Sequence, residues 1–483
     1  MVVLDRTRLT GQLISLLFFI IAMTLKEYLS TIHNKSIAVI GIGISNLPLL
    51  ELLCSEGCDV TACDRRSMEE LGDKANRLLS LGAKLCLGES YLDHLEQDLI
   101  FRTPGLMPFD KHLTAARQRG SIVTSEMEVF LSLCPCKVFA VTGSDGKTTT
   151  TTLISELLKK AGYHVYTGGN IGTPLLCKLP EMNTEDMVVV ELSSFQLHSM
   201  KCRPHTAVIT NLSPNHLDKH LDFQDYMDAK SWIFRNQCPN DRLILNAMDP
   251  HSSYYASLAH SRISYFSDQA EILNGCICKD HILSFKNGGQ LIPIMDSEEI
   301  RIPGSHNIQN MLAAFEAVRN YVSPELCRSV AMEFPGVPHR LEEIRQLNGV
   351  TYINDSIASS PTRTIAGLNA LKVKPIIIVG GYDKHIPFDF LGIELCKKAK
   401  TVILCGDTAD KIAAAIEKAS IGSVPSVSMF RTTNLKDAVR QAHQLAVSGD
   451  VVMLSPACAS FDQFSNFEER GNAFRKYVLE LDS

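Results

Sequence analysis

A short glycine-containing loop carries the residues best suited to phosphate chemistry. The apolar run Val138–Val141 leads into the loop, and a helix-like segment follows from Thr151 to Lys160. Between a strand and a helix, backbone N–H groups surround phosphate oxygens, a lysine reaches the terminal phosphates, and a hydroxyl ligates Mg²⁺. We therefore predict an ATP site made by Gly143, Ser144, Asp145, Gly146, Lys147, Thr148 and Thr149. The alternative is a Gly-Lys turn on a surface loop.

The loop is shorter than the usual phosphate-binding pattern, which has four residues between its glycines. Valine occupies position 141, so the motif is Thr-Gly-x-x-Gly-Lys-Thr-Thr, from Thr142 to Thr149. The spacing indicates a variant form of the motif.

Polar residues follow two further strand-like runs. Met187–Val190 leads to Glu191, and Ala207–Thr210 leads to a segment that contains His216. Ligands of open α/β sheets bind at the carboxyl ends of the strands. Glu191 and His216 therefore form a candidate site for magnesium or a substrate carboxylate; the alternatives are a strand-end cap and an ordinary loop histidine.

Composition restricts the class of protein. A chain of 483 residues is long enough for about three domains. The formal charge of 47 − 53 = −6, without a polybasic run, argues against nucleic-acid binding. Fifteen scattered cysteines without a paired Cys-x-x-Cys argue against a zinc site and indicate reduced thiols in a cytoplasmic protein.

The N-terminal segment could be mistaken for a targeting signal. Leu13–Leu25 is mostly apolar but too short for a comfortable membrane span, and Ala22-Met-Thr24 is a poor cleavage site. We expect residues 1–22 to be an over-extended start or a loosely attached extension. We also expect a cytoplasmic protein without stable membrane insertion.

A βαβ pattern opens the first predicted domain. The turn Gly41-Ile-Gly43 follows a strand, and Asp64 ends the next one, as in a dinucleotide-binding fingerprint. Asn46 departs from that fingerprint, and Arg65 beside Asp64 suits an anionic nucleotide. A nicotinamide oxidoreductase is therefore a rival interpretation, but it leaves the Lys147 loop unexplained.

Alternating strands and helices continue to the C-terminus. We expect a polar loop over 167–172, a strand-rich segment over 241–300 with a hairpin at Asn287, and a stiff linker at 335–338. The fold class predicted is α/β, with three mainly parallel sheets flanked by helices: a Rossmann-like domain, a phosphate-loop domain and a second Rossmann-like domain.

Several motifs together resemble those of the Mur ligase family. The short phosphate loop and the Asn211–Asp218 stretch are typical of the whole family. Glu191-Leu-Ser-Ser-Phe-Gln196 and the Ser455–Gly471 stretch are more specific to the members that add D-glutamate. The resemblance covers residue 23 to the C-terminus. It implies a UDP-substrate domain over 23–125, an ATPase domain over 126–336 and a domain for ATP and the amino acid over 337–483.

The resemblance also implies site residues. The catalytic residues would be Lys147, His216 and Lys230, with Lys230 carbamylated; from the sequence alone, Lys230 is better read as a lysine on an exposed helix face. The Mg²⁺ ligands, for two ions, would be Thr148, Glu191, His216 and Lys230. Further contacts to ATP would come from Asn310, Arg340 and Asp355. The UDP-linked substrate would meet Asp64, Arg65, Asn170 and Ser193, and D-glutamate would meet Lys384, Ser460, Phe461 and Phe467.

The activity implied is ATP-dependent addition of D-glutamate to UDP-N-acetylmuramoyl-L-alanine through an acyl phosphate, in peptidoglycan precursor synthesis. Ile357 departs from relatives that carry lysine after Asn-Asp-Ser, and Lys384 is our candidate for the missing charge. We expect a monomer. The alternatives left open are a sister Mur ligase, a ligase like folylpolyglutamate synthase, and a non-catalytic nucleotide switch.

Overall fold

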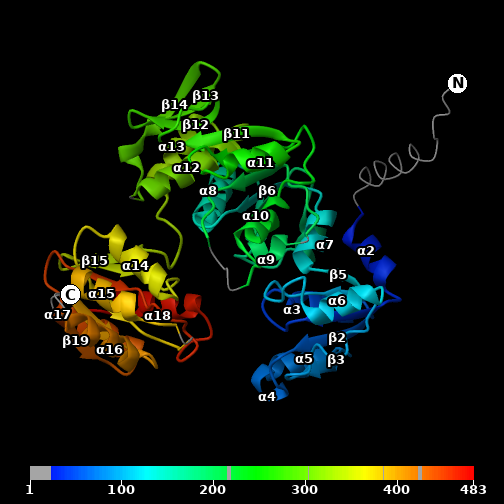
Figure 1. Ribbon diagram of the computed structural model, residues 1–483, viewed down its shortest axis with the longest axis horizontal. Helices are drawn as coiled ribbons and strands as arrows, with labels where there is room; N and C mark the ends of the chain where they lie inside the picture. Colours follow the sequence, from blue (N-terminus) through cyan, green and yellow to red (C-terminus); the bar gives the residue numbers. More distant parts are fainter. Residues whose placement is uncertain are drawn as a thin grey trace. The chain divides into compact units, whose positions relative to one another are not determined.

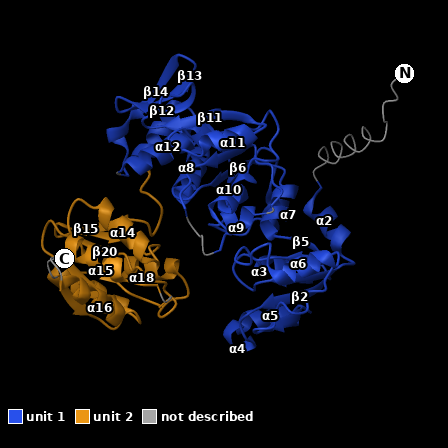
Figure 2. Cartoon of the chain, in the orientation of Figure 1, with its two compact units in different colours: residues 1–333 blue, residues 334–483 orange. Residues whose placement is uncertain are grey.

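The chain forms two compact units, residues 1–333 and 334–483, and each is described here by itself (Figure 2). The computed structural model describes residues 23–198, 200–214, 219–302, 304–383, 386–421 and 427–482. Some residues for which the sequence analysis makes predictions lie outside these ranges: residues 1–22, His216 and Lys384. The boundary between the units falls next to the linker predicted at 335–338.

The first sheet of unit 1 has five parallel strands in the order β3-β2-β1-β4-β5 (Figure 1). They are β1 (Ser36–Ile40), β2 (Asp59–Asp64), β3 (Lys84–Leu87), β4 (Leu99–Phe101) and β5 (Ile122–Thr124). The connecting helices are α2 (Leu25–Ile32), α3 (Leu47–Ser55), α4 (Met68–Leu71), α5 (Asp73–Ser80) and α6 (Lys111–Gln118). Strand β1 is central and its apolar side chains are fully buried, which confirms the predicted βαβ start.

The second sheet of unit 1 has nine strands in the order β14-β13-β12-β11-β10-β9-β6-β8-β7. Strands β6 (Lys137–Thr142), β7 (Val165–Gly169), β8 (Met187–Glu191), β9 (Thr206–Ile209), β10 (Arg242–Asn246), β11 (Arg262–Ser267) and β12 (Asn274–Lys279) are parallel. β13 (Ile282–Asn287) and β14 (Gln290–Asp296) extend the sheet as antiparallel strands. They form the hairpin predicted at Asn287.

Helices join and flank this nine-stranded sheet. They are α7 (Glu126–Leu133), α8 (Lys147–Lys160), α9 (Ser194–Leu197), α10 (Phe223–Ser231), α11 (Ser252–Leu258), α12 (Ser305–Val318) and α13 (Pro324–Glu333), with two 3₁₀ turns at Leu176–Glu181 and Ser297–Glu299. Helix α8 follows β6 directly, so the predicted phosphate loop lies at the carboxyl edge of the sheet.

The predicted polar loop over 167–172 was partly wrong, because β7 continues through Gly169. Gly169 pairs with Glu191 of β8, and a Cβ at Gly169 would lie 2.2 Å from the Glu191 carbonyl oxygen. The absence of a side chain at Gly169 therefore lets the backbones of β7 and β8 approach closely. From the sequence alone, a glycine with this role cannot be told from a glycine in a turn.

Unit 2 has one six-stranded sheet in the order β15-β16-β20-β17-β18-β19. The strands are β15 (Glu342–Leu347), β16 (Val350–Asn354), β17 (Ile376–Val379), β18 (Thr401–Leu404), β19 (Ser428–Arg431) and β20 (Val451–Leu454), and only β15 is antiparallel to its neighbour. The helices are α14 (Pro361–Ala370), α15 (Asp389–Lys398), α16 (Ala409–Ser420), α17 (Leu435–Leu445) and α18 (Phe467–Leu479). Three mainly parallel sheets with flanking helices confirm the predicted fold class.

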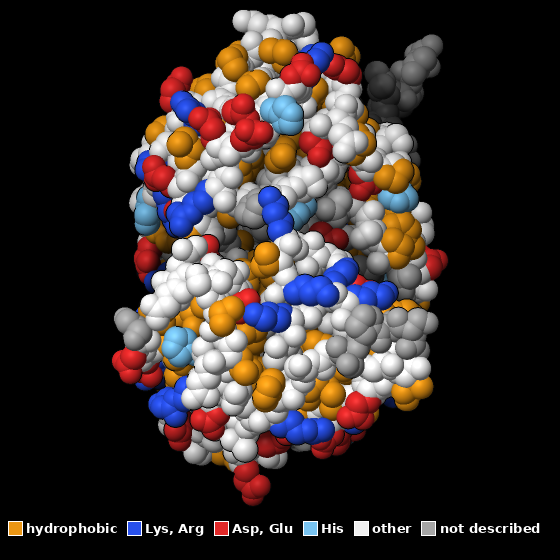
Figure 3. Space-filling model, turned by 90° about the vertical axis from the view of Figure 1, so that its left-hand side faces the viewer, with side chains coloured by type: hydrophobic (Ala, Val, Ile, Leu, Met, Phe, Trp, Pro, Cys, Tyr) orange, Lys and Arg blue, Asp and Glu red, His pale blue; other side chains and the backbone are white. Residues whose placement is uncertain are grey.

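The surface carries both signs of charge. On the face shown in Figure 3, lysine and arginine side chains are interspersed with aspartate and glutamate. Among the helices of the described ranges, none combines the length and the apolar composition that crossing a bilayer requires.

Candidate active site

Two glycines in the loop after β6 let the backbone fold against the rest of the sheet edge. Gly143 and Gly146 have φ values of +147° and +76°, which side chains rarely tolerate. A Cβ at Gly143 would lie 1.9 Å from the Thr210 hydroxyl oxygen, and one at Gly146 would lie 2.3 Å from Asn310 Oδ1. Asn310, which the family resemblance predicts to contact ATP, therefore packs on the phosphate loop.

Thr148, Glu191 and Asn170 form one hydrogen-bonded group beside the loop. The Thr148 hydroxyl donates to Glu191 Oε2 (2.7 Å), and Asn170 Nδ2 donates to Glu191 Oε1 (2.8 Å). Glu191 is 1% exposed and ends β8, which lies between β6 and β7. A carboxylate and a hydroxyl oxygen at this spacing are the donor types that Mg²⁺ prefers. Two predicted metal ligands are thus brought together.

Lys230 lies beneath the phosphate loop, fully enclosed. Its side chain is 1% exposed, and Nζ donates to the Gly143 carbonyl (2.7 Å) and to the Thr142 hydroxyl (3.3 Å). Burial, followed by repulsion from Lys147, lowers the pKa of the Lys230 ammonium well below its ordinary value. The alternative that Lys230 lies on an exposed helix face is therefore wrong, because α10 directs this side chain toward the sheet edge.

Lys147 and Ser144 complete the loop. Lys147 Nζ donates to the carbonyls of Gly143 (3.1 Å) and Ser144 (2.9 Å). The Ser144 hydroxyl contacts the Tyr226 hydroxyl (2.9 Å) and accepts from the Ser213 N–H (2.9 Å). Tyr226 also places its ring 4.6 Å from Lys230 Nζ. The sequence motifs assign no role to Tyr226; its spacing of four from Lys230 on one helix was the available signal.

A network of two histidines and an aspartate braces α9 and α10. Asp225 accepts from His198 Nε2 (2.9 Å) and His220 Nδ1 (2.8 Å), while His220 Nε2 lies 2.9 Å from the Ser194 hydroxyl oxygen. One potential metal-ligating atom from each of His198, His220 and Asp225 lies within 4.8 Å of the other two. These contacts join the two imidazole rings, Asp225 and the Ser194 hydroxyl in one hydrogen-bonded group. The group therefore acts as a structural link between the two helices.

At the first sheet, Arg66 rather than Arg65 pairs with Asp64. Arg66 Nη2 lies 2.8 Å from Asp64 Oδ2, and Asp64 Oδ2 also accepts from the Ile42 N–H (2.7 Å). Although burial acts in the opposite direction, these contacts lower the pKa of Asp64. Arg65 forms an exposed ion pair with Glu89 (3.2 Å). Its predicted contact with the nucleotide substrate stays a prediction.

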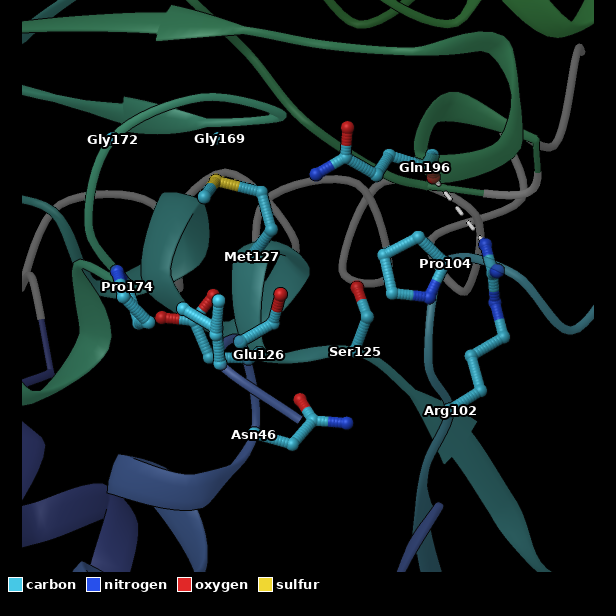
Figure 4. Close-up of a pocket in the computed structure, with 12 residues that line it drawn as sticks. Asn46, Arg102, Pro104, Ser125, Glu126, Met127, Gly169, Gly172, Pro174 and Gln196 are labelled. Atoms are coloured by element: carbon cyan, nitrogen blue, oxygen red, sulfur yellow. Dashed lines mark hydrogen bonds between the residues drawn. The ribbon is translucent and has the colours of Figure 1, made fainter. Parts of the chain in front are cut away.

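A pocket opens between the first and second sheets of unit 1 (Figure 4). Its walls come from the turn before α3, the segment after β4, the start of α7, the loop after β7, and α9. The lining residues are Ile44, Ser45, Asn46, Arg102, Pro104, Ser125, Glu126, Met127, Gly169, Gly172, Pro174 and Gln196. Ser193, predicted to meet the substrate, caps α9 through a reciprocal bond with Gln196 and therefore fixes this wall.

In unit 2, Asp355 ends up buried at the carboxyl end of β16. Its Oδ2 accepts from the Ser455 hydroxyl (2.7 Å), and its Oδ1 accepts from the Leu341 N–H (3.3 Å). Burial raises the pKa of Asp355 to about 7, an effect that these bonds and the charges of Arg340 and Arg363 only partly offset. Arg340 and Asp355, both predicted to contact ATP, therefore interact.

Arg363 is a residue that sequence reasoning missed. Its Nη1 donates to the carbonyl of Ile357 (3.3 Å), the position where some relatives carry lysine. The sequence signal was an arginine in the first turn of a helix that begins at Pro361, shortly after Ile357.

The three described residues predicted for D-glutamate have unlike environments. Ser460 is 2% exposed, Phe461 is 62% exposed and contacts the Tyr382 ring, and Phe467 begins α18. The Phe467 carbonyl accepts from the Ser356 hydroxyl (2.8 Å), so it lies against the strand end that carries Asp355. Arg470 joins these segments by donating to Ser356 Oγ (3.0 Å) and to the Cys458 and Ala459 carbonyls.

Comparison with known proteins identifies the family. Residues 141–318 match the family model of the Mur ligase middle domain, and residues 339–458 match that of the Mur ligase, glutamate ligase domain. The UDP-N-acetylmuramoylalanine--D-glutamate ligase of Acetivibrio thermocellus is 48% identical over 462 residues, 95% of this chain and 99% of the relative. The enzyme of the same name from Clostridium novyi is 46% identical over 463 residues, again covering 95% and 99%.

The fold agrees with this relationship. The structure of UDP-N-acetylmuramate-alanine ligase from Thermotoga maritima is similar with a TM-score of 0.56 over 92% of this chain and 99% of that chain. Its sequence identity is 19%, so this likeness shows the fold alone. The chain therefore belongs to the Mur ligase family, as its sequence motifs predict.

Proposed function

We propose that this enzyme uses ATP to join the amine of D-glutamate to the terminal carboxylate of UDP-N-acetylmuramoyl-L-alanine, a step of peptidoglycan precursor synthesis. The high identity to two D-glutamate ligases over nearly the whole chain supports this assignment. The single structural observation that carries it is the Thr148–Glu191 contact beside a glycine loop and a buried lysine. Such a site suits phosphoryl transfer and needs no nucleophilic triad.

The residues of unit 1 fit ATP and magnesium. The loop backbone and Lys147 would hold the phosphates, and Thr148 and Glu191 would hold the metal together with His216. A bound Mg²⁺ neutralises phosphate charge and thereby makes attack by an anion easier. Lys230 can lose its proton readily, because burial disfavours the ammonium, and a neutral amine is the form that combines with CO₂. As a carbamate it would become a further anionic ligand.

The reaction has two balanced steps. A carboxylate oxygen of the muramoyl-alanine attacks the γ-phosphorus of ATP, ADP leaves, and an acyl phosphate forms. The amine of D-glutamate then attacks the acyl carbon and loses a proton, and the carbon–oxygen bond to phosphate breaks. Lys147 would stabilise the charge that moves onto the phosphates, and the buried surroundings of Glu191 would limit access of water.

The remaining assignments extend this proposal. Asn170, Ser193, Asp64 and Arg65 would contact the nucleotide substrate, Asn310, Arg340 and Asp355 would contact ATP, and Lys384, Ser460, Phe461 and Phe467 would contact D-glutamate. We further propose three domains over 23–125, 126–336 and 337–483, a hinge at 335–338, and a monomeric cytoplasmic enzyme.

Phosphate release tests the proposal directly. Purified enzyme with ATP and Mg²⁺ is assayed with UDP-N-acetylmuramoyl-L-alanine and one amino acid at a time: D-glutamate, L-glutamate, L-alanine or a diamino acid. We expect turnover with D-glutamate and at most a background rate with the others. Equal turnover with L-glutamate would favour a ligase like folylpolyglutamate synthase, and turnover with a different amino acid would indicate a sister ligase.

A further inference from the structure

Arg102 is a buried cation in unit 1 without a carboxylate partner. It follows β4 directly and is 4% exposed. Its Nη2 donates to the carbonyls of Phe195 (2.9 Å), His198 (3.2 Å) and Gln196 (3.4 Å), and its Nη1 donates to the Leu106 carbonyl (3.2 Å). Within the described ranges, no carboxylate lies within ion-pair distance of this guanidinium. Burial lowers the pKa of Arg102 only to about 10, so the side chain keeps its charge at neutral pH.

A buried charge that meets only dipoles is costly. Backbone carbonyls satisfy N–H donors but supply no net negative charge, and burial of an ion without a counter-charge is unfavourable. Two buried acids of unit 1 form ion pairs: Asp64 with Arg66, and Glu316 with Arg242. Arg102 differs from these pairs, because the nearby charge of Glu128 favours its charged form but does not lie within ion-pair distance.

The guanidinium lines the pocket between the two sheets of unit 1. Figure 4 shows Arg102 at one side of it, bonded to the Gln196 carbonyl, with Asn46 and Ser125 among the neighbouring side chains. The acid in the wall, Glu126, is directed to other partners, because its Oε1 accepts from the Leu175 and Leu176 N–H groups (3.0 and 2.8 Å). The pocket thus combines the Arg102 guanidinium with neutral hydrogen-bonding groups and one carboxyl group that the backbone already engages.

Arg102 also connects the pocket to the carboxyl end of β8, where Glu191 lies. The three carbonyls that it binds through Nη2 belong to α9 and the residue after it, and α9 begins three residues after Glu191. The bonds run from the first sheet to the second, so the same side chain fixes two walls of the pocket.

We propose that Arg102 is a further substrate-positioning residue, whose charge attracts an anionic group of the nucleotide substrate into this pocket while its hydrogen bonds hold α9 against the first sheet. The inference rests on the proposed function for the identity of the nucleotide. That substrate has two anionic groups, the diphosphate and the alanine carboxylate, and either one would supply the missing counter-charge.

Binding measurements without ATP test this role. Calorimetry compares UDP-N-acetylmuramoyl-L-alanine with UDP-N-acetylglucosamine, which has the diphosphate but no carboxylate, on wild type, R102Q, R102M and R102K. We expect R102Q and R102M to weaken binding of the substrate at least about tenfold, the effect of losing one charge-assisted hydrogen bond. R102K should recover part of the loss because it keeps the charge. Equal losses for both nucleotides assign the contact to the diphosphate, and a loss confined to the substrate assigns it to the carboxylate.

Arg119 provides the matched control. It lies in the same part of unit 1 and donates to a backbone carbonyl, that of Leu95 (2.7 Å), but does not line the pocket. R119Q should therefore bind both nucleotides as wild type does. Steady-state assays should show a raised KM for the nucleotide in R102Q and a KM for ATP within about twofold of wild type.

Three outcomes would overturn the inference. Wild-type affinity in R102Q and R102M would show that the charge does not serve binding. Failure of both uncharged variants to fold, judged by thermal unfolding against R119Q, would assign the charge to the fold. A loss in R102K as large as that in R102M would show that charge is not the property that matters. Absence of nucleotide binding by the wild type would instead contradict the proposed function.

Discussion

The Thr148 hydroxyl donates a hydrogen bond of 2.7 Å to the carboxylate of Glu191, although 43 positions separate the two residues. Thr148 lies in the first turn of α8, and Glu191 ends β8, which is the neighbour of β6 in the sheet. The contact joins the phosphate loop to the adjacent strand end and places two oxygen donors side by side.

Replacing either member of this pair should abolish most activity while leaving the fold intact. We expect Thr148→Val and Glu191→Gln to reduce kcat at least about 100-fold, because each removes an oxygen ligand or its charge at a phosphoryl-transfer site. Thr148→Ser keeps the hydroxyl and should retain most activity. Initial rates over a Mg²⁺ titration measure the effect, and near-normal rates for Glu191→Gln would contradict the proposed role.

Lys230 should be essential through its carbamate. Lys230→Ala is expected to lose activity and to regain part of it when small carboxylates such as acetate or formate are added, since these can occupy the vacated anionic position. The matched control is Lys159→Ala, which alters a half-exposed lysine paired with Glu156 and should change nothing. Phosphate release with and without added carboxylate is the measurement. Inactivity that no carboxylate rescues would leave the carbamate without support.

Gly146→Ala should impair ATP binding specifically. Its φ of +76° and the 2.3 Å approach of a Cβ to Asn310 Oδ1 mean that the loop or Asn310 must shift. Gly162, just beyond the C-terminal end of α8, has φ of +93° and no atom within 4 Å of such a Cβ. Both alanine variants should lose about 1 kcal/mol of stability from backbone strain. Only Gly146→Ala should raise the KM for ATP, by about tenfold or more; an equal KM in the two variants would argue against the packed loop.

Asp355 should make stability depend on pH. Its pKa is about 7 in the folded protein against an ordinary value of 3.8, so the folded state holds a proton that the unfolded state releases. The stability that Asp355 contributes therefore falls as pH rises from about 4 to about 7 and is constant above that range. Asp355→Asn cannot ionise and should lack this component.

The test is the difference in Tm between wild type and Asp355→Asn, recorded at several pH values from 4.5 to 8.5. Wild type should lose Tm relative to the variant as pH rises toward about 7. Ser455→Ala, which removes a bond that stabilises the carboxylate, should enlarge the loss. A pH-independent difference would show that Asp355 ionises normally.

Features that depend on neighbouring residues could be predicted from the amino-acid sequence. Strand-type runs that end in glycine turns predicted the α/β class, and Asn287-Gly-Gly predicted a hairpin, because backbone preferences act over a few positions. The phosphate loop from Thr142 to Thr149 was recognisable for the same reason. Its lysine, hydroxyl and glycines are contiguous, and their function follows from that local order.

Contacts between residues far apart in the sequence could be identified only from the three-dimensional fold. Lys230 is buried under the phosphate loop. Asp64 forms its ion pair with Arg66 and not with Arg65. Arg102 donates to backbone carbonyls of α9. Gly169, predicted to be a loop residue, is a strand residue beside Glu191. Burial depends on the packing of segments that are far apart in the chain, and so do the pKa changes that burial causes. Local sequence patterns do not predict such packing. The contiguous loop residues thus predicted phosphate binding, whereas tertiary packing determines which other side chains surround the loop.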